Sequence, residues 1–286
     1  MTFIKSHGKI KENGGDRLRL HLVVGAGGTG SYFVSKLCNH LSNDVGNVVL
    51  LLDGDVVEAK NLERQAFTGS DLGKNKAIAI MDNIYSSYPK LKLGAFPNYV
   101  VSIKHLLNLV SLMTSLFSVS EIIFYGCSDN NALRARLFYT LPLLRKNLGI
   151  RVGYIDSGNS EYNGQVLSTL YDTNKTFTDS LIARYEVPFV EALTYGDFEL
   201  SCADIAVSSP QNILTNQMAA SLLLTCLEAL EKNEPINYEF DSKECMIVPL
   251  EKVKKVLYRE KLVEMQKSEW FEKEKQEDSF IQIKWY

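Results

Sequence analysis

Four glycines in one short turn are the residues whose types and spacing first suggest chemistry. They lie in GAGGTGS, between the apolar run RLRLHLVV (17–24) and an amphipathic stretch. Gly25 permits a tight turn, Gly27 and Gly28 let bare backbone amides approach phosphate oxygens, and Gly30 completes a GxGxxG spacing. The start of the next helix adds partial positive charge. The segment predicts a phosphate-binding loop, unless the glycines serve only close packing of helix and strand.

An acidic residue at the end of the next apolar run is a candidate ribose ligand. Asp53 closes the strand-like run NVVLLLDGD (47–55). At this distance behind a glycine turn, a carboxylate can accept hydrogen bonds from a ribose hydroxyl. The role fits NAD and ATP equally, and a plain turn residue would also fit. Asp53 therefore does not identify the nucleotide.

The segment beyond Asp53 favours ATP. In LLDGDVVEAKNLERQAFTGSDLGKNKA (51–77), carboxylates, asparagines, an arginine, a glutamine and lysines surround and follow the ribose position. Hydride transfer needs no such groups, whereas nucleotidyl transfer does, because the α-phosphate and the departing pyrophosphate carry extra negative charge. Arg64 and Lys76 could neutralise that charge. Asp129, in GCSDNN at the end of a later strand, could hold a Mg²⁺ ion that bridges the phosphates.

These motifs occur together in the order and spacing of a known family. The chain has GAGGTGS, DGDVVEAKNLERQ, DLGKNKA and CSDNN. The corresponding family pattern is GxGGxGS, DxDxVxxxNLxRQ, DxGxxK and a strand that ends in DN. Residues 20–160 thus resemble the adenylation domain of the ThiF/MoeB/E1 superfamily, the ATP-dependent activators of ubiquitin and ubiquitin-like sulfur carriers. The resemblance covers roughly half of the chain.

The resemblance implies a site for ATP and Mg²⁺. The residues that it assigns to this site act as follows: Gly25, Gly27, Gly28 and Gly30 cradle the nucleotide, Asp53 holds the ribose, Asp55 lies near the phosphates or the metal, Asn61 and Arg64 contact phosphates, Gln65 supports them, Lys76 stabilises the α-phosphate and Asp129 binds magnesium. The implied substrate is the C-terminal carboxylate of a ubiquitin-like or sulfur-carrier-like protein, often ending in Gly-Gly. Its attack on the α-phosphate gives an acyl adenylate and pyrophosphate.

Two departures from the family pattern bear on partners and metals. Relatives often carry two CxxC pairs for zinc, and this chain has none, so no zinc is expected. Many relatives also have an N-terminal helix whose arginine reaches the partner subunit, and here Arg17 is the candidate. With these departures, the chain resembles divergent bacterial members of the family that act with ubiquitin-like and E2-like partners. Because family members are usually homodimers, a homodimer is expected.

The five cysteines raise the question of a catalytic thiol. Members of the family can pass the adenylated substrate to a cysteine, forming a thioester. Cys202, in ELSCADIAVSSPQN, is the best candidate because it follows a long polar segment, where a thiol could reach the adenylate. Cys245 is a second candidate. Cys38, Cys127 and Cys226 lie in patterns that predict core positions.

Composition excludes several classes of protein. The chain has 286 residues, 45% of them apolar, and a net charge of −3, so no nucleic-acid partner is indicated. Isolated cysteines and an N-terminus without an apolar signal predict a cytoplasmic protein. The apolar run 213–230 contains polar residues such as Asn216, which favours a buried helix over a membrane span.

The alternation of apolar strands and amphipathic helices predicts an α/β fold. We expect a doubly wound, mainly parallel sheet, Rossmann-like, with helices on both faces. The chain divides into a nucleotide-binding half (1–171), a crossover loop with the buried helix and the rest of the adenylation domain (172–250), and a charged C-terminal tail (251–286). In the tail, residues 251–278 are expected to form a solvent-exposed helix, and FIQIKWY a last strand.

Two other functions compete with adenylation. A nicotinamide-dependent oxidoreductase would use the glycine turn and Asp53, but it would leave Arg64, Lys76 and Asp129 without a role. A non-catalytic scaffold that binds a ubiquitin-like protein would be expected if the nucleotide motifs were eroded, and they are intact. Adenylation is therefore the function that the sequence favours.

Overall fold

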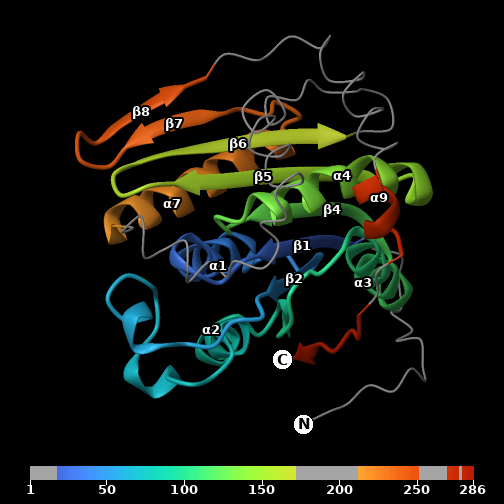
Figure 1. Ribbon diagram of the computed structural model, residues 1–286, viewed down its shortest axis with the longest axis horizontal. Coiled ribbons are helices and arrows are strands. Elements are labelled where there is room, and N and C mark those ends of the chain that lie inside the picture. The colour runs from blue at the N-terminus through green and yellow to red at the C-terminus, as the bar shows by residue number, and fades with distance from the viewer. Residues whose placement is uncertain (1–17, 172–211, 251–268, 277–278) are drawn as a thin grey trace.

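A single mixed sheet forms the centre of the protein. The computed structural model describes residues 18–171, 212–250, 269–276 and 279–286. Their nine strands lie in the order β8-β7-β6-β5-β4-β1-β2-β3-β9 (Figure 1). The strands are β1 (Leu18–Val24), β2 (Asn47–Leu52), β3 (Lys92–Phe96), β4 (Val119–Gly126), β5 (Arg151–Asn159), β6 (Asn163–Tyr171), β7 (Tyr238–Asp241), β8 (Met246–Pro249) and β9 (Lys284–Trp285).

The five central strands are parallel, as the sequence predicted. β3, β2, β1, β4 and β5 run in one direction, and their carboxyl ends lie on the left of Figure 1, where the arrow of β5 points. On one side β6, β7 and β8 extend the sheet as antiparallel hairpins, and on the other β9 pairs antiparallel with β3. Residues such as those of β2, buried along their whole length, require cover on both faces.

Helices cover the two faces of the sheet. The α-helices are α1 (Gly28–Leu41), α2 (Lys76–Ile84), α3 (Ile103–Leu116), α4 (Asn131–Leu148), α7 (Ile213–Glu231) and α9 (Glu269–Glu274). The apolar side chains of α1, α2 and α7 form one core with one face of the sheet, and those of α3, α4 and α9 form a second core with the other face. This arrangement confirms the doubly wound fold class.

Polar side chains fix where several helices begin. Asn75, Asn130 and Asn212 each accept a hydrogen bond from an amide in the first turn of α2, α4 and α7. Ser102 does the same for α3, a helix that the sequence analysis did not predict. Its buried residues, such as Leu106, Leu109, Val110 and Met113, follow a helical spacing.

The apolar helix α7 is part of the interior. By length and composition α7 could cross a membrane, but 56% of its most apolar window is buried inside the protein. It contacts α1, β5 and β6. Asn216 in its first turn is fully buried and hydrogen-bonded to other elements, as a core helix permits. The prediction of a buried helix is confirmed.

The described part of the C-terminal tail docks on the second core, which corrects the prediction of a solvent-exposed helix there. In α9, Phe271 and Glu274 are buried. The carboxylate of Glu274 accepts hydrogen bonds from the Arg136 guanidinium and from the backbone amide of Ile103, at the start of α3. The expected last strand is present as the two-residue β9. The rest of the predicted helix lies outside the described residues, and the three-part division of the chain remains a prediction.

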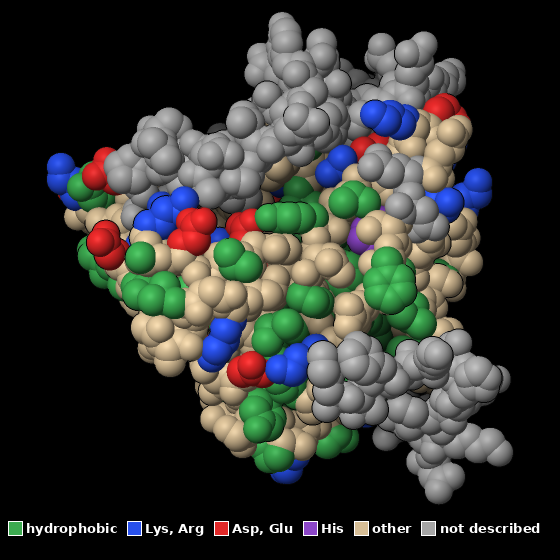
Figure 2. Space-filling model, turned by 60° about the horizontal axis from the view of Figure 1, so that its bottom comes forward, with side chains coloured by type: hydrophobic (Ala, Val, Ile, Leu, Met, Phe, Trp, Pro, Cys, Tyr) green, Lys and Arg blue, Asp and Glu red, His purple; other side chains and the backbone are tan. Residues whose placement is uncertain are grey.

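The surface is mixed in character. Figure 2 shows one face, on which apolar side chains are interspersed among polar and charged ones. Scattered exposure of this kind is ordinary for a globular protein.

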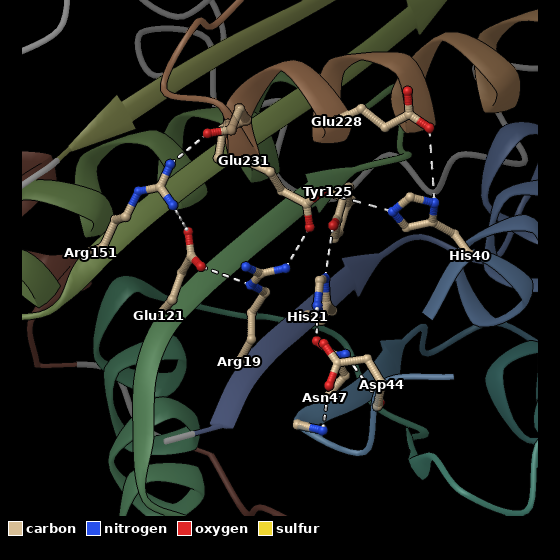
Figure 3. A network of polar contacts seen from close by, with 12 residues as sticks. Arg19, His21, His40, Asp44, Asn47, Glu121, Tyr125, Arg151, Glu228 and Glu231 are labelled. Carbon is tan, nitrogen blue, oxygen red and sulfur yellow. Dashed lines mark hydrogen bonds and ion pairs between the residues drawn. The ribbon is translucent and has the colours of Figure 1, made fainter. Parts of the chain in front are cut away.

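A polar network closes the amino end of the sheet, opposite the carboxyl ends of the parallel strands (Figure 3). Arg19 on β1 forms ion pairs with Glu121 on β4 and Glu231 on α7, and Arg151 on β5 forms a second ion pair with Glu121. These contacts tie three neighbouring strands and α7 together where the strands begin.

His21, two residues after Arg19 on β1, is fully buried. His21 Nδ1 is 2.8 Å from the Tyr125 hydroxyl, and Nε2 is 3.0 Å from Asn47 Oδ1. Burial lowers the pKa of His21 from 6.5 to about 3, with the Asn47 hydrogen bond acting weakly in the opposite direction. The imidazole is therefore neutral in the folded protein at neutral pH.

We expect acid to destabilise the protein through His21. Between pH 6.5 and pH 3, His21 is protonated in the unfolded chain but stays neutral in the folded chain. The free energy of unfolding that is present above pH 6.5 therefore falls as the pH falls through this range. The loss is about 1.4 kcal/mol per pH unit, or about 2 kcal/mol between pH 6.5 and pH 5. Urea unfolding at pH 7.5 and pH 5 should show a smaller acid loss in His21→Gln than in the unmutated protein. Equal losses in both would contradict the assignment.

Candidate nucleotide site

The glycine turn joins β1 to α1 in a backbone conformation that demands glycine. Gly25 has φ of 102°, and a Cβ there would lie 2.7 Å from the carbonyl oxygen of Cys127. A Cβ on Gly30 would lie 1.9 Å from the carbonyl oxygen of Gly25. Gly27 caps α1 with no side-chain hydrogen bond, so the first-turn amides that begin at Gly28 are not capped by a side chain. Such amides suit an anion.

Asp53 lies beside this turn, at the end of the neighbouring strand β2. Its Oδ2 accepts a hydrogen bond of 2.6 Å from the amide of Ala26, and its Oδ1 one of 2.8 Å from the amide of Asp55. Burial and the nearby Asp55 raise the pKa of Asp53, while Lys76 and the two amides oppose the shift. The carboxylate thus connects the glycine turn to the next loop.

Lys76 and Asp55 form an ion pair next to Asp53. Lys76, the first residue of α2, is only 6% exposed, and its Nζ lies 2.9 Å from Asp55 Oδ2. Asn75 donates hydrogen bonds to the carbonyl oxygens of both Asp53 and Asp55, which fixes the start of α2 against the end of β2. The sequence motifs place the lysine 21 positions after Asp55, and the fold brings the two together.

Tyr99 completes this arrangement, and the sequence analysis missed it. It follows β3, and its hydroxyl donates a hydrogen bond to Asp55 Oδ1. Its ring lies against Gly54, where a Cβ would come within 2.6 Å of ring carbon atoms. Burial alone would raise the pKa of Asp55, but the Tyr99 hydrogen bond and Lys76 outweigh it and lower that pKa. No motif of the sequence points to this tyrosine.

The NLERQ segment lies against the glycine turn. Asn61 is buried, and its side chain accepts a hydrogen bond from the amide of Glu58, so it shapes its own loop. Gln65 is also buried near Gly27, and its Oε1 has no hydrogen-bond partner among the described residues. Arg64 is half-buried, and no ion pair or hydrogen bond joins its guanidinium to another described residue. The segment therefore presents polar groups beside the turn.

Asp129 follows β4 and has a basic neighbour that the sequence analysis did not single out. The side chain of Asp129 is 34% exposed, with Oδ1 4.0 Å from Arg134 on α4. Arg134 also forms an ion pair of 3.1 Å with the fully buried Asp156, and it donates a hydrogen bond to the carbonyl oxygen of Ser157. Gly126 makes room for this pair, because a Cβ there would lie 2.1 Å from Asp156.

A chain of side-chain contacts holds α7 against the glycine turn. Thr29 donates to Asn159 at the end of β5, Asn159 donates to Asn216 on α7, and Asn216 donates to the carbonyl oxygen of Arg64. Elements from three distant parts of the sequence therefore meet at one edge of the sheet.

The cysteines separate into buried and exposed groups. Cys38, Cys127 and Cys226 are buried, as predicted, and burial raises the pKa of all three thiols, which keeps them protonated. Cys245 is exposed in the turn between β7 and β8. Cys202 and Arg17 lie outside the described residues.

Two further observations concern ligands. The Phe240 ring fills the space over Gly164, since a Cβ on Gly164 would lie 2.3 Å from it. Among the described residues, no group of three or more histidine, cysteine or acidic side chains is arranged to hold a metal ion.

The fold and site define a class of nucleotide-binding α/β protein. A glycine turn, the carboxylate of Asp53 and the buried Lys76 lie at the carboxyl ends of parallel strands, where such folds bind ligands. The model of the ThiF family matches residues 9–261. This chain belongs to the ThiF family. The search of curated proteins found no match.

Solved structures share this fold. E. coli MccB with ATP superimposes with a TM-score of 0.57 at 16% identity, covering 85% of this chain and 66% of MccB. E. coli MccB with AMPCPP and MccA gives 0.57 at 18% identity, covering 83% and 65%. PaaA gives 0.53 at 18% identity, covering 84% and 65%. This chain therefore spans slightly less than two thirds of the length of each of these proteins.

We expect Gly30→Ala to destabilise the protein by about 3 kcal/mol, because the added methyl group would meet a backbone oxygen that cannot rotate away. Gly69→Ala is the matched control. A Cβ at Gly69 meets nothing within 4 Å, so its effect should stay within about 0.5 kcal/mol. Urea unfolding measures both variants, and similar stability of the two would contradict the close contact.

Proposed function

We propose that this chain is an ATP-dependent adenylyltransferase that activates the C-terminal carboxylate of a protein or peptide. Membership of the ThiF family supports the proposal. The observation that carries it is the buried Lys76 ammonium, held by Asp55 next to Asp53 and close to the glycine turn. A hydride-transferring enzyme has no use for this cation, whereas a reaction at phosphorus does.

In the proposed reaction, a carboxylate oxygen of the substrate forms a bond to the α-phosphorus of ATP. The bond from that phosphorus to the oxygen that bridges to the β-phosphate breaks, and pyrophosphate leaves. The glycine turn and the first amides of α1 bind phosphate oxygens, Asp53 orients the ribose, and Lys76 neutralises charge on the α-phosphate. Arg64, whose backbone carbonyl oxygen accepts a hydrogen bond from Asn216, contributes a second cation in this proposal.

The residues present fit a magnesium ion bound together with ATP. Mg²⁺ is usually held by one or two carboxylates, with phosphate oxygens and waters completing its coordination. Asp129 supplies a partly exposed carboxylate of this type. When bound, the ion would neutralise charge on the phosphates.

The substrate is proposed to be a ubiquitin-like or carrier protein, or a shorter peptide. MccB structures that share the fold contain MccA or a form of MccA, which supports a protein or peptide as the substrate. Only the carboxylate chemistry is common to these candidates, so the first experiments should vary the C-terminus.

Pyrophosphate exchange into ATP tests the proposal. A panel of peptides and small proteins with free C-termini should include one that supports exchange, and the same sequence with an amidated C-terminus should not. Lys76→Ala should lower the exchange rate by about 100-fold or more, as the loss of a charge-stabilising group does. Lys74→Ala is the matched control, because Lys74 is exposed and pairs only with Asp71 among the described residues. Binding of NADH without binding of ATP would contradict the proposal.

A thioester step is a separate proposal within this function. We expect the Cys202 thiolate to attack the acyl carbon of the adenylate, so that a carbon–sulfur bond forms, the bond from that carbon to the phosphate oxygen breaks and AMP leaves; Cys245 is the alternative. Cys202→Ala should retain pyrophosphate exchange but lose a covalent adduct that is cleaved by reducing agent, whereas Cys245→Ala should keep both. Gel electrophoresis with and without reductant measures the adduct. The opposite pattern would assign the thiol to Cys245, and an adduct in both variants would exclude each as the sole carrier.

A further inference from the structure

Tyr99 is an exposed aromatic residue with a specific polar contact in the candidate site. Its side chain is 56% exposed, so its position is not explained by burial. One surface of the ring lies against Gly54, where no larger residue would fit, and the hydroxyl donates to Asp55 Oδ1. The residue is thus held at both its ring and its hydroxyl.

Asp55 connects this tyrosine to Lys76. One carboxylate oxygen of Asp55 accepts from Tyr99, and the other pairs with the Lys76 ammonium at 2.9 Å. The backbone of Asp55 is fixed separately, by the Asn75 side chain and by the amide of Lys76, both of which donate to its carbonyl oxygen. With the backbone fixed, the remaining freedom of Asp55 is rotation of its carboxylate, and Tyr99 restrains that rotation.

We propose that Tyr99 is a positioning residue that acts through Asp55 to fix the Lys76 ammonium in the nucleotide site. This inference rests on the proposed function for its catalytic consequence, but the geometry itself can be tested without ATP. A long lysine side chain has many rotamers, and a partner that is itself anchored reduces them. Loss of the Tyr99 hydroxyl would leave Asp55 less restrained and Lys76 less precisely placed.

Chemical labelling of lysines tests the positioning directly. In Tyr99→Phe the ring still lies on Gly54, and only the hydroxyl is lost. Brief treatment with acetic anhydride, read by mass spectrometry, should label Lys76 about threefold faster in this variant, because a weakened hydrogen-bonded ion pair frees the amine more often. Lys74 serves as the internal reference in the same digest. Tyr85→Phe is the control variant, since Tyr85 is a similarly exposed tyrosine whose ring contacts Tyr286 instead. Unchanged labelling of Lys76 in Tyr99→Phe would overturn the proposal.

Pyrophosphate exchange then tests the consequence. Tyr99→Phe should lower the maximal exchange rate about tenfold, while its affinity for AMPCPP, measured by calorimetry, changes by less than about threefold. In an Asp55→Asn background the same substitution should have little further effect, because both changes break one chain of contacts. A tenfold further loss in that background would overturn the proposal. Absence of exchange in the unmutated protein would remove the proposed function, while the labelling result would still decide the role of Tyr99.

Discussion

The ion pair between Lys76 and Asp55 is the interaction on which the rest of the candidate site depends. A lysine that is 6% exposed is stable as a cation only when its ammonium is paired and hydrogen-bonded. Asn75 fixes the backbone on both sides of the pair, because its side chain donates hydrogen bonds from the start of α2 to the carbonyl oxygens of Asp53 and Asp55 after β2. The result is a positive charge held in a fixed place, with little reorganisation needed when an anion arrives.

The parallel sheet explains why the polar groups are neighbours. The carboxyl ends of β4, β1, β2 and β3 lie side by side, and they lead to Asp129, the glycine turn, Asp53 and Tyr99. Successive loops can therefore place the backbone amides, the carboxylates and the cation next to one another, and the chain needs no long connection to do so. The antiparallel strands β6 to β8 widen the sheet but do not disturb this edge.

Distant segments stabilise the two sides of the site. On one face, Asn216 of α7 links Asn159 to the loop that carries Arg64. On the other, Glu274 near the C-terminus pairs with Arg136, two residues beyond the Arg134 that lies near Asp129 and pairs with Asp156. The tail therefore anchors α4, the helix that follows Asp129, although the sequence of the tail predicts a solvent-exposed helix.

The amino-acid sequence by itself determined the alternation of strands and helices, the glycine turn and the order of the family motifs. These features are local: apolar periodicity, closely spaced glycines and fixed motif spacing can all be read along the chain. Tertiary structure alone decided the partners of Tyr99, Arg134 and Glu274, because each contact joins residues on separate elements. It also showed that Phe240 fills the space over Gly164 and that Asn61 shapes its own loop. Whether a charged residue faces solvent or a buried partner depends on how the elements pack, and no pattern within a single segment records that.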